Sequence, residues 1–477
     1  FIIMLYNLFM RILTSESMSM CDRRSMDDQK VDEIYLVNKA ARACFDNLRD
    51  KINHDSKIIV VCGNSNNSSD GFCLIDILIK EGYDAKALYL FDKSKMNKTC
   101  SHFYKDELVT RELGNPDVII DCVIGNGLKG TLREDVVELI NLLNNTKAYK
   151  IAIDLPTGLN SNTGNYDPIC FKADLTIAIN NLKLGHLLNR GPDVCGEIRI
   201  ADIGLNDYED LEHVDTIKLD LKHKRLAFSN KYDYGCVLVI GSNVSMAGAG
   251  IMSSISALKS GAGLATLAVP KENYDVVSIK APLEIMVKKL EDVDNLLIKK
   301  DTVVFGPGLG RCEDYTSILK VLLSRDINLI VDADGLYHLS KIDDIKEIKK
   351  CRLCITPHFG EAATLLGKTI KDDPFNAFKE LVDKYDCIVA LKGHNTLVGD
   401  KNHYYLSLYG NSGMATAGSG DVLSGIIAGL SLKKLDLDKV CQAVALHGFA
   451  GDEASKKYGE DSLIASDIYN SIYLGFK

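Results

Sequence analysis

The stretch Asn411-Ser412-Gly413-Met414-Ala415-Thr416-Ala417-Gly418-Ser419-Gly420-Asp421 sets small residues around its glycines and ends on an acid. The apolar run over residues 422–430 follows directly and predicts a helix that is buried nearly all round. A glycine-rich turn that opens a helix presents backbone N–H groups to an anion, and the helix dipole adds to the attraction. A carboxylate fixed beside that anion can accept a proton from a hydroxyl while charge builds on a phosphoryl group. The stretch therefore favours phosphoryl transfer to an alcohol; the alternative is a tight turn in which Asp421 only caps the helix.

Outward from this stretch, strand-like and helix-like segments alternate along both halves of the chain. In the first half, we expect strands at 57–63, 85–91, 116–121, 150–154, 175–179 and 197–203, and helices at 38–48, 71–82 and 135–143. In the second half, we expect strands at 235–240, 264–269, 301–305, 327–331, 354–355 and 387–391, a turn over 241–250 and a helix at 251–260. Apolar strands that alternate with helices predict parallel sheets covered on both faces. The polar segment 207–224 separates two α/β domains, expected at 18–210 and 222–477.

The composition limits the class of protein. A chain of 477 residues, at about 100–200 residues per domain, also suggests two domains. The net charge of −9 argues against a nucleic-acid binder, which usually shows a basic field. The 14 cysteines are scattered, which indicates reduced thiols and a cytoplasmic protein. The apolar run 1–10 is too short to span a bilayer, so no membrane partner is expected. A start at Phe1 suggests a fragment or an over-extended sequence, and a weak organellar targeting segment is the lesser alternative.

Polar residues gather where three expected strands of the first half end. They are Gly63-Asn64-Ser65-Asn66-Asn67-Ser68-Ser69-Asp70-Gly71, Asp121-Cys122-Val123-Ile124-Gly125-Asn126-Gly127-Leu128-Lys129-Gly130-Thr131 and Asp154-Leu155-Pro156-Thr157-Gly158. Ligands bind at the carboxyl ends of strands in open α/β sheets. Asn, Asp and Thr oxygens suit an alkali or alkaline-earth cation, and the 125–130 loop can bring N–H groups to a phosphate. Simple turn chemistry is the alternative, because Asn and Asp are favoured in turns.

Together with Met20-Cys21-Asp22-Arg23-Arg24 and Lys183-Leu184-Gly185-His186-Leu187-Leu188, these stretches resemble the NAD(P)H-hydrate epimerase domain, the YjeF N-terminal family, over about residues 18–206. The resemblance implies a Rossmann-like α/β/α sandwich in which Asn67, Asp121 and Thr157 bind potassium. It implies that Asp154 is the acid/base that interconverts the two epimers at position 6 of the hydrated nicotinamide ring. The residues it assigns to the hydrated dinucleotide are Asn66, Asn67, Ser68, Ser69, Asp70, Gly125, Asn126, Gly127, Leu128, Lys129, Gly130, Thr131 and Asp154.

The first half departs from this family pattern at three places. Ser68 and Ser69 stand where two glycines are usual, and their side chains could crowd the diphosphate or hydrogen-bond to it. The family's Gly-Thr-Gly is Gly125-Asn126-Gly127 here, and its usual Glu-Asn is Asn38-Lys39. These departures keep open the alternative that the first domain is a ligand-binding or protein-interaction module without catalysis.

Four more polar turns follow expected strands of the second half. They are Gly306-Pro307-Gly308-Leu309-Gly310, Asp332-Ala333-Asp334-Gly335-Leu336, Thr356-Pro357-His358-Phe359-Gly360-Glu361 and Leu391-Lys392-Gly393-His394-Asn395-Thr396. Each alone is a weak signal, since a single His or Lys is more often a turn or surface residue. In order, and closed by Gly418-Ser419-Gly420-Asp421, they resemble the NAD(P)H-hydrate dehydratase domain, which has a ribokinase-like fold, over about residues 226–477.

This second resemblance implies a substrate site, a nucleotide site and a reaction. The hydrated dinucleotide would contact Ala249, Gly310, His358 and Asp421, and ADP or ATP with Mg²⁺ would bind at Lys392, Gly393, His394, Asn395, Thr396 and Gly420. Phosphorylation makes the ring hydroxyl a good leaving group: Asp421 takes its proton, and the N–H groups of residues 418–420 stabilise the transferring phosphoryl. Fused two-domain members resemble users of ADP, so AMP and phosphate are the expected by-products, and both families suggest a homo-oligomer. A ribokinase-like kinase for a small alcohol is the alternative function.

Overall fold

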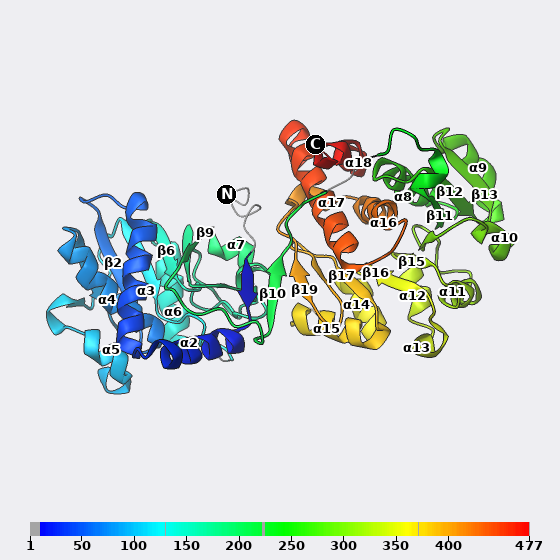
Figure 1. Cartoon of the computed structure of the whole chain (residues 1–477). Coiled ribbons are helices and arrows are strands. Elements are labelled where there is room, and N and C mark those ends of the chain that lie inside the picture. Colours follow the sequence, from blue (N-terminus) through cyan, green and yellow to red (C-terminus); the bar gives the residue numbers. More distant parts are fainter. Residues whose placement is uncertain (1–9, 129, 222–224, 371, 477) are drawn as a thin grey trace. The chain divides into compact units, whose positions relative to one another are not determined.

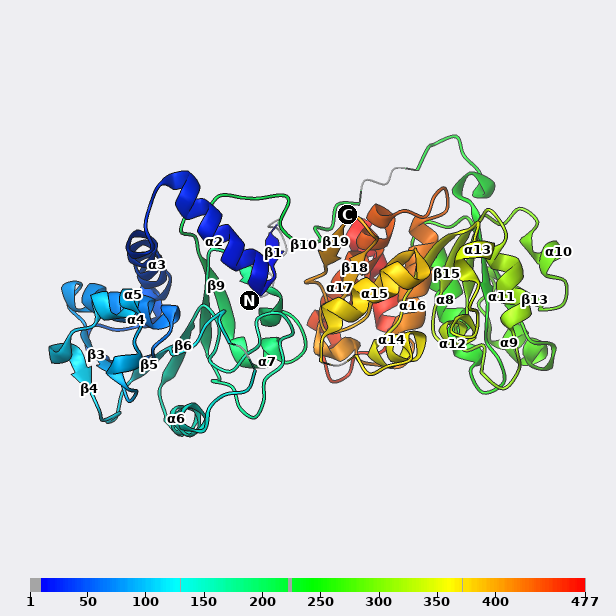
Figure 2. The ribbon, with the colours of Figure 1, turned by 90° about the horizontal axis from the view of Figure 1, so that it is seen from below.

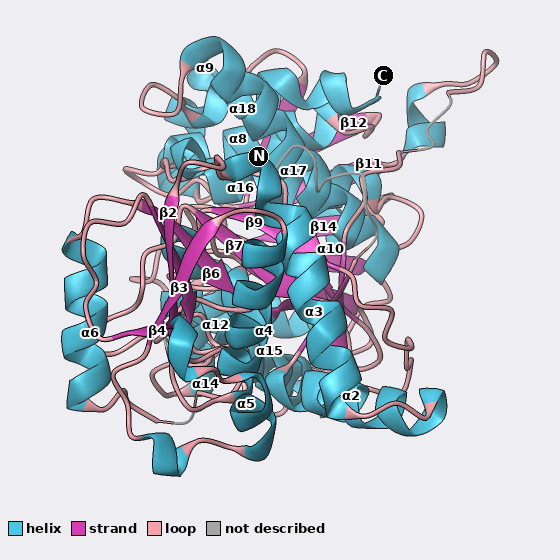
Figure 3. Cartoon of the chain, turned by 90° about the vertical axis from the view of Figure 1, so that its left-hand side faces the viewer, coloured by secondary structure: helices cyan, strands magenta, loops and turns pink. Residues whose placement is uncertain are grey.

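The structure, a computed structural model, describes residues 10–128, 130–221, 225–370 and 372–476. The described chain forms two compact units that divide between Val214 and Asp215 (Figure 1). Each unit contains a largely parallel sheet with helices beside it, which confirms the expected α/β class in both halves (Figure 3). Within the described residues, no helix combines the length and the apolar character needed to cross a membrane.

The first unit is built on a seven-stranded parallel sheet in the order β4-β3-β2-β5-β6-β7-β9. Its strands are β2 (Lys57–Cys62), β3 (Asp84–Leu88), β4 (Val109–Thr110), β5 (Val118–Cys122), β6 (Tyr149–Ile153), β7 (Leu175–Ile179) and β9 (Glu197–Ala201). Strands β1 (Arg11–Leu13) and β8 (Leu182–Lys183) also pair in parallel. The helices are α2 (Ser15–Gln29), α3 (Glu33–Leu48), α4 (Asn66–Lys80), α5 (Lys98–Phe103), α6 (Glu134–Asn145) and α7 (Gly191–Cys195).

Strand β2 shows why this sheet is apolar on both faces. Its alternate residues Ile58, Val60 and Cys62 join the core formed with α3 and α4. The residues between them, Ile59 and Val61, join a second core formed with α6. Figure 2 shows α6 on the face of the sheet opposite to α3 and α4. A strand buried on both sides needs an unbroken apolar run, which is the pattern that predicted it.

The second unit is built on a sheet whose strands follow the order β13-β12-β11-β14-β15-β16-β17-β18-β19-β10. Its strands are β10 (His213–Thr216), β11 (Cys236–Ile240), β12 (Leu264–Val269), β13 (Ile285–Lys289), β14 (Thr302–Phe305), β15 (Asn328–Val331), β16 (Arg352–Ile355), β17 (Ile388–Leu391), β18 (Leu397–Gly399) and β19 (Tyr404–Leu406). The strands from β13 to β17 pair in parallel, β18 is antiparallel to both neighbours, and β10 pairs in parallel with β19. The helices are α8 (Ala247–Lys259), α9 (Tyr274–Lys280), α10 (Val293–Leu297), α11 (Thr316–Leu323), α12 (Asp334–Leu339), α13 (Ile345–Ile348), α14 (Phe359–Leu366), α15 (Pro374–Tyr385), α16 (Ser419–Leu430), α17 (Leu437–Tyr458) and α18 (Ala465–Ser471).

Three helices begin earlier than the sequence pattern predicted. Helix α3 begins at Glu33 rather than at residue 38, and α8 begins at Ala247, which shortens the expected 241–250 turn. Helix α4 begins at Asn66 rather than at residue 71, because the Ser65 hydroxyl accepts a hydrogen bond from the Ser68 N–H and caps the helix there. Much of the polar stretch 63–71, expected as a loop, is therefore the first turns of α4.

Helix α16 is buried nearly all round, as predicted, and packs directly on α8. Residues 422–429 are all buried, and the hydroxyls of Ser253 and Ser424 lie 3.1 Å apart. A Cβ added at Gly425 would lie 2.1 Å from the carbonyl oxygen of Ser253. A Cβ added at Gly429 would lie 2.6 Å from that of Ala257. Glycine at these positions lets the two backbones touch, and the first turn of α16 is fixed by that contact.

We expect Gly425→Ala to lower the free energy of unfolding of the second unit by about 1–3 kcal/mol, because the added methyl overpacks a rigid backbone contact. Gly248→Ala in α8 is the matched control, since its Cβ would meet only the end of Met252, at 3.8 Å. Urea denaturation of the full chain measures both. Equal stability of the two variants would contradict the close contact between α8 and α16.

Candidate functional site

Asp154 directly follows β6, and its backbone is held in the left-handed region with φ 66°. Its N–H donates to the carbonyl of Ile177 at 2.8 Å, and its carbonyl accepts from His186 Nε2 at 2.7 Å. His186 Nδ1 accepts from the backbone N–H of Lys183 at 3.0 Å, so the ring proton sits on Nε2. Burial lowers the pKa of His186 to about 4 and keeps the ring neutral. This frame fixes the direction of the Asp154 side chain.

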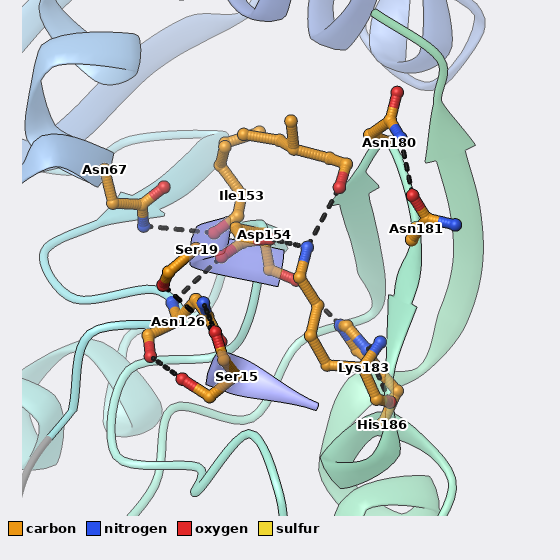
Figure 4. A network of polar contacts seen from close by, with 11 residues as sticks. Ser15, Ser19, Asn67, Asn126, Ile153, Asp154, Asn180, Asn181, Lys183 and His186 are labelled. Carbon is orange, nitrogen blue, oxygen red and sulfur yellow. Dashed lines mark hydrogen bonds and ion pairs between the residues drawn. The ribbon is translucent and has the colours of Figure 1, made fainter. Parts of the chain in front are cut away.

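The Asp154 carboxylate forms a buried ion pair with Lys183, as Figure 4 shows. Lys183 Nζ lies 2.5 Å from Asp154 Oδ1 and also donates to the carbonyl of Ile179 at 2.9 Å. The backbone N–H of Asn126 donates to Asp154 Oδ2 at 2.9 Å. Burial acts to raise the pKa of Asp154, but the Lys183 ammonium outweighs it and holds the pKa below its ordinary value. The sequence motif containing Lys183 gave no sign of this pairing, because the two residues lie 29 positions apart.

Two further carboxyl groups lie within electrostatic range of the same ammonium. Asp22 on α2 and Asp70 on α4 are both half-buried, and the charges of Lys183 and Asp154 act on each. Burial raises the pKa of Asp22 to about 6. Burial, and then the charge of Asp154, raise the pKa of Asp70 well above its ordinary value. This group of side chains therefore combines one ionised carboxylate with two carboxyl groups that are protonated more readily, a division typical of acid–base sites.

The predicted potassium ligands Asp121 and Thr157 lie together at the end of β5. Asp121 is fully buried and accepts from the Thr157 N–H and hydroxyl, each at 2.7 Å, and from the Val123 N–H at 3.1 Å. Burial raises the pKa of Asp121 to about 6. Within the described part of the chain, no Lys or Arg side chain pairs with this carboxylate. A buried carboxylate without a counter-ion is a fitting ligand for a cation.

Asn67, the third predicted ligand, has an unsatisfied oxygen. Its Nδ2 donates to the carbonyl of Ile153 at 3.1 Å, and its Oδ1 is buried with no hydrogen-bond partner among the described residues. A Cβ added at Gly125 would lie 3.2 Å from Asn67 Cγ, and the N–H of Ile124 donates to the Thr157 hydroxyl at 3.0 Å. The 124–125 backbone thus lies between Asn67 and Thr157. All the side-chain donors are oxygens, so the residues present fit a hard cation such as potassium.

The loop that begins at Gly125 lies against both Asp154 and α2. A Cβ at Gly125 would lie 2.7 Å from Asp154 Oδ2, so only glycine fits there. Asn126 Nδ2 donates to the carbonyl of Ser15 at 3.2 Å, and the Ser15 hydroxyl donates to the Asn126 carbonyl at 3.1 Å. Of the other predicted dinucleotide residues, Asn66, Gly127, Gly130 and Thr131 are exposed and Leu128 is half-buried. Lys129 lies outside the described residues.

Ser68 and Ser69, which replace the usual glycines, are both completely buried. The Ser68 hydroxyl accepts from the N–H of Gly63 at 2.7 Å and donates to the carbonyl of Cys122 at 2.8 Å. It ties the start of α4 to the ends of β2 and β5, and it does not project toward a ligand. Any contact that Ser68 makes with a diphosphate would therefore come from the backbone at the start of the helix, whereas the buried Ser69 Oγ has no hydrogen-bond partner among the described residues.

In the second unit, α16 begins at Ser419 and Gly418 precedes it with φ 92°. The Ser419 N–H donates to the carbonyl of Thr416 at 3.3 Å. The N–H groups of Gly420 and Asp421 have no hydrogen-bond acceptor within the described ranges. The anion site predicted over 418–420 therefore has free donors at its helical end, at the first turn of α16.

A lysine lies among carboxylates here too. Lys392 Nζ lies 2.8 Å from Asp332 Oδ1 and 3.8 Å from Glu361 Oε2. A Cβ added at Gly420 would lie 3.3 Å from the same ammonium. Burial, and then the charge of Asp332, raise the pKa of Asp421 to about 7, although Lys392 opposes them. Asp332 and Glu361 stood in the quoted motifs, but their spacing gave no indication of this effect.

His358 caps α14. Its Nδ1 accepts from the N–H of Glu361 at 3.2 Å, and the His358 N–H donates to Glu361 Oε2 at 2.8 Å. Backbone pairing sets His358 beside Lys392, so the substrate and nucleotide segments predicted separately are neighbours. Of the remaining predicted nucleotide residues, Gly393 and His394 are exposed and Asn395 and Thr396 are half-buried.

Ala249 and the 306–310 turn that contains Gly310 also meet at the carboxyl edge of this sheet. A Cβ added at Gly308 would lie 2.8 Å from Ala249 Cβ, and Gly310, with φ 86°, donates its N–H to Asp334 Oδ2 at 2.9 Å. The charge of Asp334 acts in turn on Asp421. A cavity of about 1630 Å³ lies at the other edge, near the starts of β11 and β14, and its lining holds none of the predicted residues. The sequence-predicted residues of this unit therefore gather where open α/β sheets bind ligands.

Comparison with known proteins matches both units. Residues 33–185 match the family model described as YjeF-related protein N-terminus, and residues 237–473 match that described as NAD(P)H-hydrate dehydratase. The bifunctional NAD(P)H-hydrate repair enzyme Nnr of Coxiella burnetii is 34% identical over 464 residues, which cover 92% of this chain and 94% of the relative. The Escherichia coli enzyme of the same name is 31% identical over 468 residues, covering 92% and 88%. A solved ADP/ATP-dependent NAD(P)H-hydrate dehydratase from Bacillus subtilis, co-crystallised with ATP and Mg²⁺, is 23% identical with a TM-score of 0.48, covering 53% of this chain and 92% of that chain.

We expect Lys183→Met to lower the free energy of unfolding of the first unit by about 3–5 kcal/mol near neutral pH, because it leaves the buried Asp154 carboxylate without its cation. Lys93→Met is the matched control: Lys93 pairs with Asp106 at the surface, where both side chains are more than half exposed, and no measurable change is expected. Chemical denaturation of both variants measures these changes in the free energy of unfolding. If Lys183→Met is as stable as the control, the buried pair contributes nothing to the fold.

Proposed function

Because the chain belongs to the family of bifunctional NAD(P)H-hydrate repair enzymes, we propose how its residues divide the two reactions of that family. The first unit carries the epimerase domain and the second carries the dehydratase domain. The protein thus repairs hydrated NADH and NADPH: the first domain interconverts the R and S hydrates, and the second dehydrates the S hydrate. The alternative of a kinase for a small alcohol gains no support from these relatives.

In the epimerase domain, Asp154 exchanges a proton with the hydroxyl on C6 of the hydrated ring. The supporting observation is its buried ion pair with Lys183 at the carboxyl end of β6. The ammonium keeps Asp154 ionised and ready to accept a proton, while the Asn126 N–H and the His186 contact fix its orientation. The Ser68 hydroxyl donates to the carbonyl of Cys122 and does not project from the start of α4, which supports an active first domain.

Potassium would be held by Asn67 Oδ1, Asp121 and Thr157. When bound, it supplies positive charge and oxygen coordination that can orient the diphosphate of the dinucleotide. The unsatisfied Asn67 oxygen and the unpaired Asp121 carboxylate support this assignment. The exposed residues of the 125–131 loop, together with Asn66 and Asp70, would contact the rest of the substrate.

In the dehydratase domain, Asp421 takes the proton of the ring hydroxyl as that oxygen attacks the terminal phosphoryl group of the nucleotide. The free N–H groups of Gly420 and Asp421, together with Lys392, stabilise the charge on the transferring group. Phosphate then leaves the ring and NAD(P)H is restored. The supporting observation is the position of Asp421 in the first turn of α16, with Lys392 beside Gly420.

Magnesium would enter this site with the nucleotide. Among the described residues, no group of three or more His, Cys, Asp or Glu side chains could hold a metal ion. Mg²⁺ often keeps several waters and binds through substrate phosphates, with few protein ligands, so the residues present fit an ion carried by ADP. Ala249, Gly310 and His358 would contact the hydrated dinucleotide, and the segment Lys392–Thr396 would contact the nucleotide. ADP is the proposed phosphoryl donor, and ATP is the alternative.

The chain is further proposed to form a homo-oligomer. Apolar side chains stand exposed beside the edge strand β13 of the second unit, including Ile279 at 85% and Leu283 at 101% exposure. Exposed apolar surface at a sheet edge is a common site of association between copies of a chain.

Substitution of the two proposed acid/base residues should separate the activities. With both epimers of hydrated NADH, ADP, Mg²⁺ and potassium, the wild-type chain should restore all the NADH absorbance. Asp154→Asn should restore about half rapidly and the rest at the spontaneous rate. Asp421→Asn should restore none, while R and S hydrates still interconvert by chromatography. Loss of both activities in either variant would contradict the assignment of one reaction to each unit.

The dehydration step should depend on the ionisation of Asp421. Its pKa is raised to about 7, so the carboxyl is protonated below that pH and is a base above it. We expect kcat/KM for the S hydrate to rise about tenfold per pH unit below pH 7 and to level off above. Asp332→Asn removes a like charge beside Asp421 and should shift the rising limb to lower pH. An unmoved limb in that variant, or a flat profile in the wild type, would rule out Asp421 as the titrating base.

A further inference from the structure

Helix α2 forms one wall of the epimerase site. Its first residue, Ser15, exchanges two hydrogen bonds with Asn126, whose N–H in turn donates to Asp154. Figure 4 shows Ser15 and Ser19 of this helix beside Asn126. The helix start is therefore anchored to the loop that holds the Asp154 carboxylate.

The rotation of α2 brings Asp22 to the same side as Ser15. Residues at i, i+4 and i+7 share a helix face, which puts Ser15, Ser19 and Asp22 in one row. The adjacent buried row, Met18 and Cys21, packs with Leu13 and Leu211 and prevents the helix from turning. Asp22 thus lies at the edge of the buried row, on the side of the site.

The Asp22 carboxyl group lies within electrostatic range of the catalytic pair. The charges that act on it are those of Lys183 and Asp154, and it acts in turn on Asp70. Yet no described backbone or side-chain group hydrogen-bonds to its oxygens, although the residue is only partly exposed to solvent. A carboxyl that lies near an ion pair without a hydrogen bond from a described residue has oxygens available for a ligand.

We propose that Asp22 is a second catalytic residue of the epimerase site, which exchanges a proton with the C6 hydroxyl in partnership with Asp154. The inference rests on the proposed function of the first unit. An epimerisation at C6 needs one group to give a proton to a leaving hydroxyl and another to take a proton from the water that replaces it. Asp22 from α2 and Asp154 from the end of β6 are the two carboxyls that meet these needs.

The step balances with these two groups. Protonated Asp22 gives its proton to the hydroxyl, the C6–O bond breaks with its electron pair, and water leaves. The lone pair of the ring nitrogen forms a C=N bond to C6. Water then adds to the opposite face of C6, and the Asp154 carboxylate takes the proton that this water releases. Return of the proton from Asp154 to Asp22 through water resets the site, and the reverse reaction uses the same groups in exchanged roles.

Asp70 is the other carboxyl group near Lys183, but its environment suits a role other than proton exchange. Its neighbours are mostly acidic, with Asp154, Asp22 and Glu33 all acting ahead of Lys183. Burial and these acidic charges raise the pKa of Asp70 well above its ordinary value, which favours its neutral form. Asp22, on which Lys183 acts ahead of Asp154, has a pKa raised only to about 6 and can both give and take a proton near neutral pH.

The test is the epimerisation of the pure R hydrate of NADH by the full chain without nucleotide, followed by chromatography and corrected for the spontaneous rate. Asp22→Asn should lower kcat about 100-fold or more with KM changed less than about threefold, the scale expected for loss of a general acid–base group. Asp22→Glu should recover part of kcat, because it restores a carboxyl. Asp27→Asn is the control: it lies on the same helix, exposed to solvent, and should match the wild type.

Urea denaturation of the same preparations shows whether the first unit of each variant is folded, and dehydration of the S hydrate with ADP shows that the second unit is unaffected. A kcat for Asp22→Asn within twofold of the wild type, or a loss confined to KM, would overturn the inference. A larger loss of kcat in Asp70→Asn than in Asp22→Asn would also overturn the inference. A wild-type chain that does not epimerise the R hydrate would overturn the proposed function of the first unit itself, a result distinct from an active wild type with an active Asp22→Asn.

Discussion

In each domain, a lysine ammonium lies among several carboxyl groups that are largely withdrawn from water. Carboxylates cannot share such a pocket without a cation, because their mutual repulsion and the loss of hydration favour the protonated form. In the first domain, the charge of Lys183 acts on Asp154, Asp22 and Asp70. In the second, the charge of Lys392 acts on Asp332, Glu361 and Asp421. The pKa values of Asp154 and Asp421 therefore depend on where that ammonium lies.

The two domains use the same arrangement to opposite effect. Lys183 bonds directly to the proposed acid/base, so Asp154 stays ionised below its ordinary pKa. Lys392 bonds instead to Asp332, a neighbour of the proposed base, and the pKa of Asp421 rises to about 7. A site that handles a ring hydroxyl reversibly benefits from a carboxylate that is always available. A site that transfers a phosphoryl group benefits from a base whose proton affinity matches the working pH.

The apolar runs of the sequence predicted most of the strands of the fold. β7 and β12 begin and end where the pattern predicted, because strands buried on both faces need unbroken apolar runs. The first residues of helices were harder to predict. Helix α4 begins at Asn66, inside a polar stretch with the composition of a loop. Serine is common both at helix N-caps and in turns, so Ser65 did not distinguish the two. From the sequence, the Ser68 side chain could either crowd the diphosphate or hydrogen-bond to it. In the structure its hydroxyl does neither and donates to the carbonyl of Cys122.

The sequence by itself determined the two α/β domains, the polar turns at the carboxyl ends of their strands, and, through family resemblance, the acids expected at each site. These follow from local composition and order, which the chain carries directly. Only the tertiary structure decided which charges meet. Lys183 reaches Asp154 across 29 positions and Lys392 reaches Asp332 across 60, while Asp22 arrives from a helix more than 130 residues away from Asp154 in the chain. Coulomb interactions depend on distance in space and on burial, and neither quantity is written in the linear spacing of the residues.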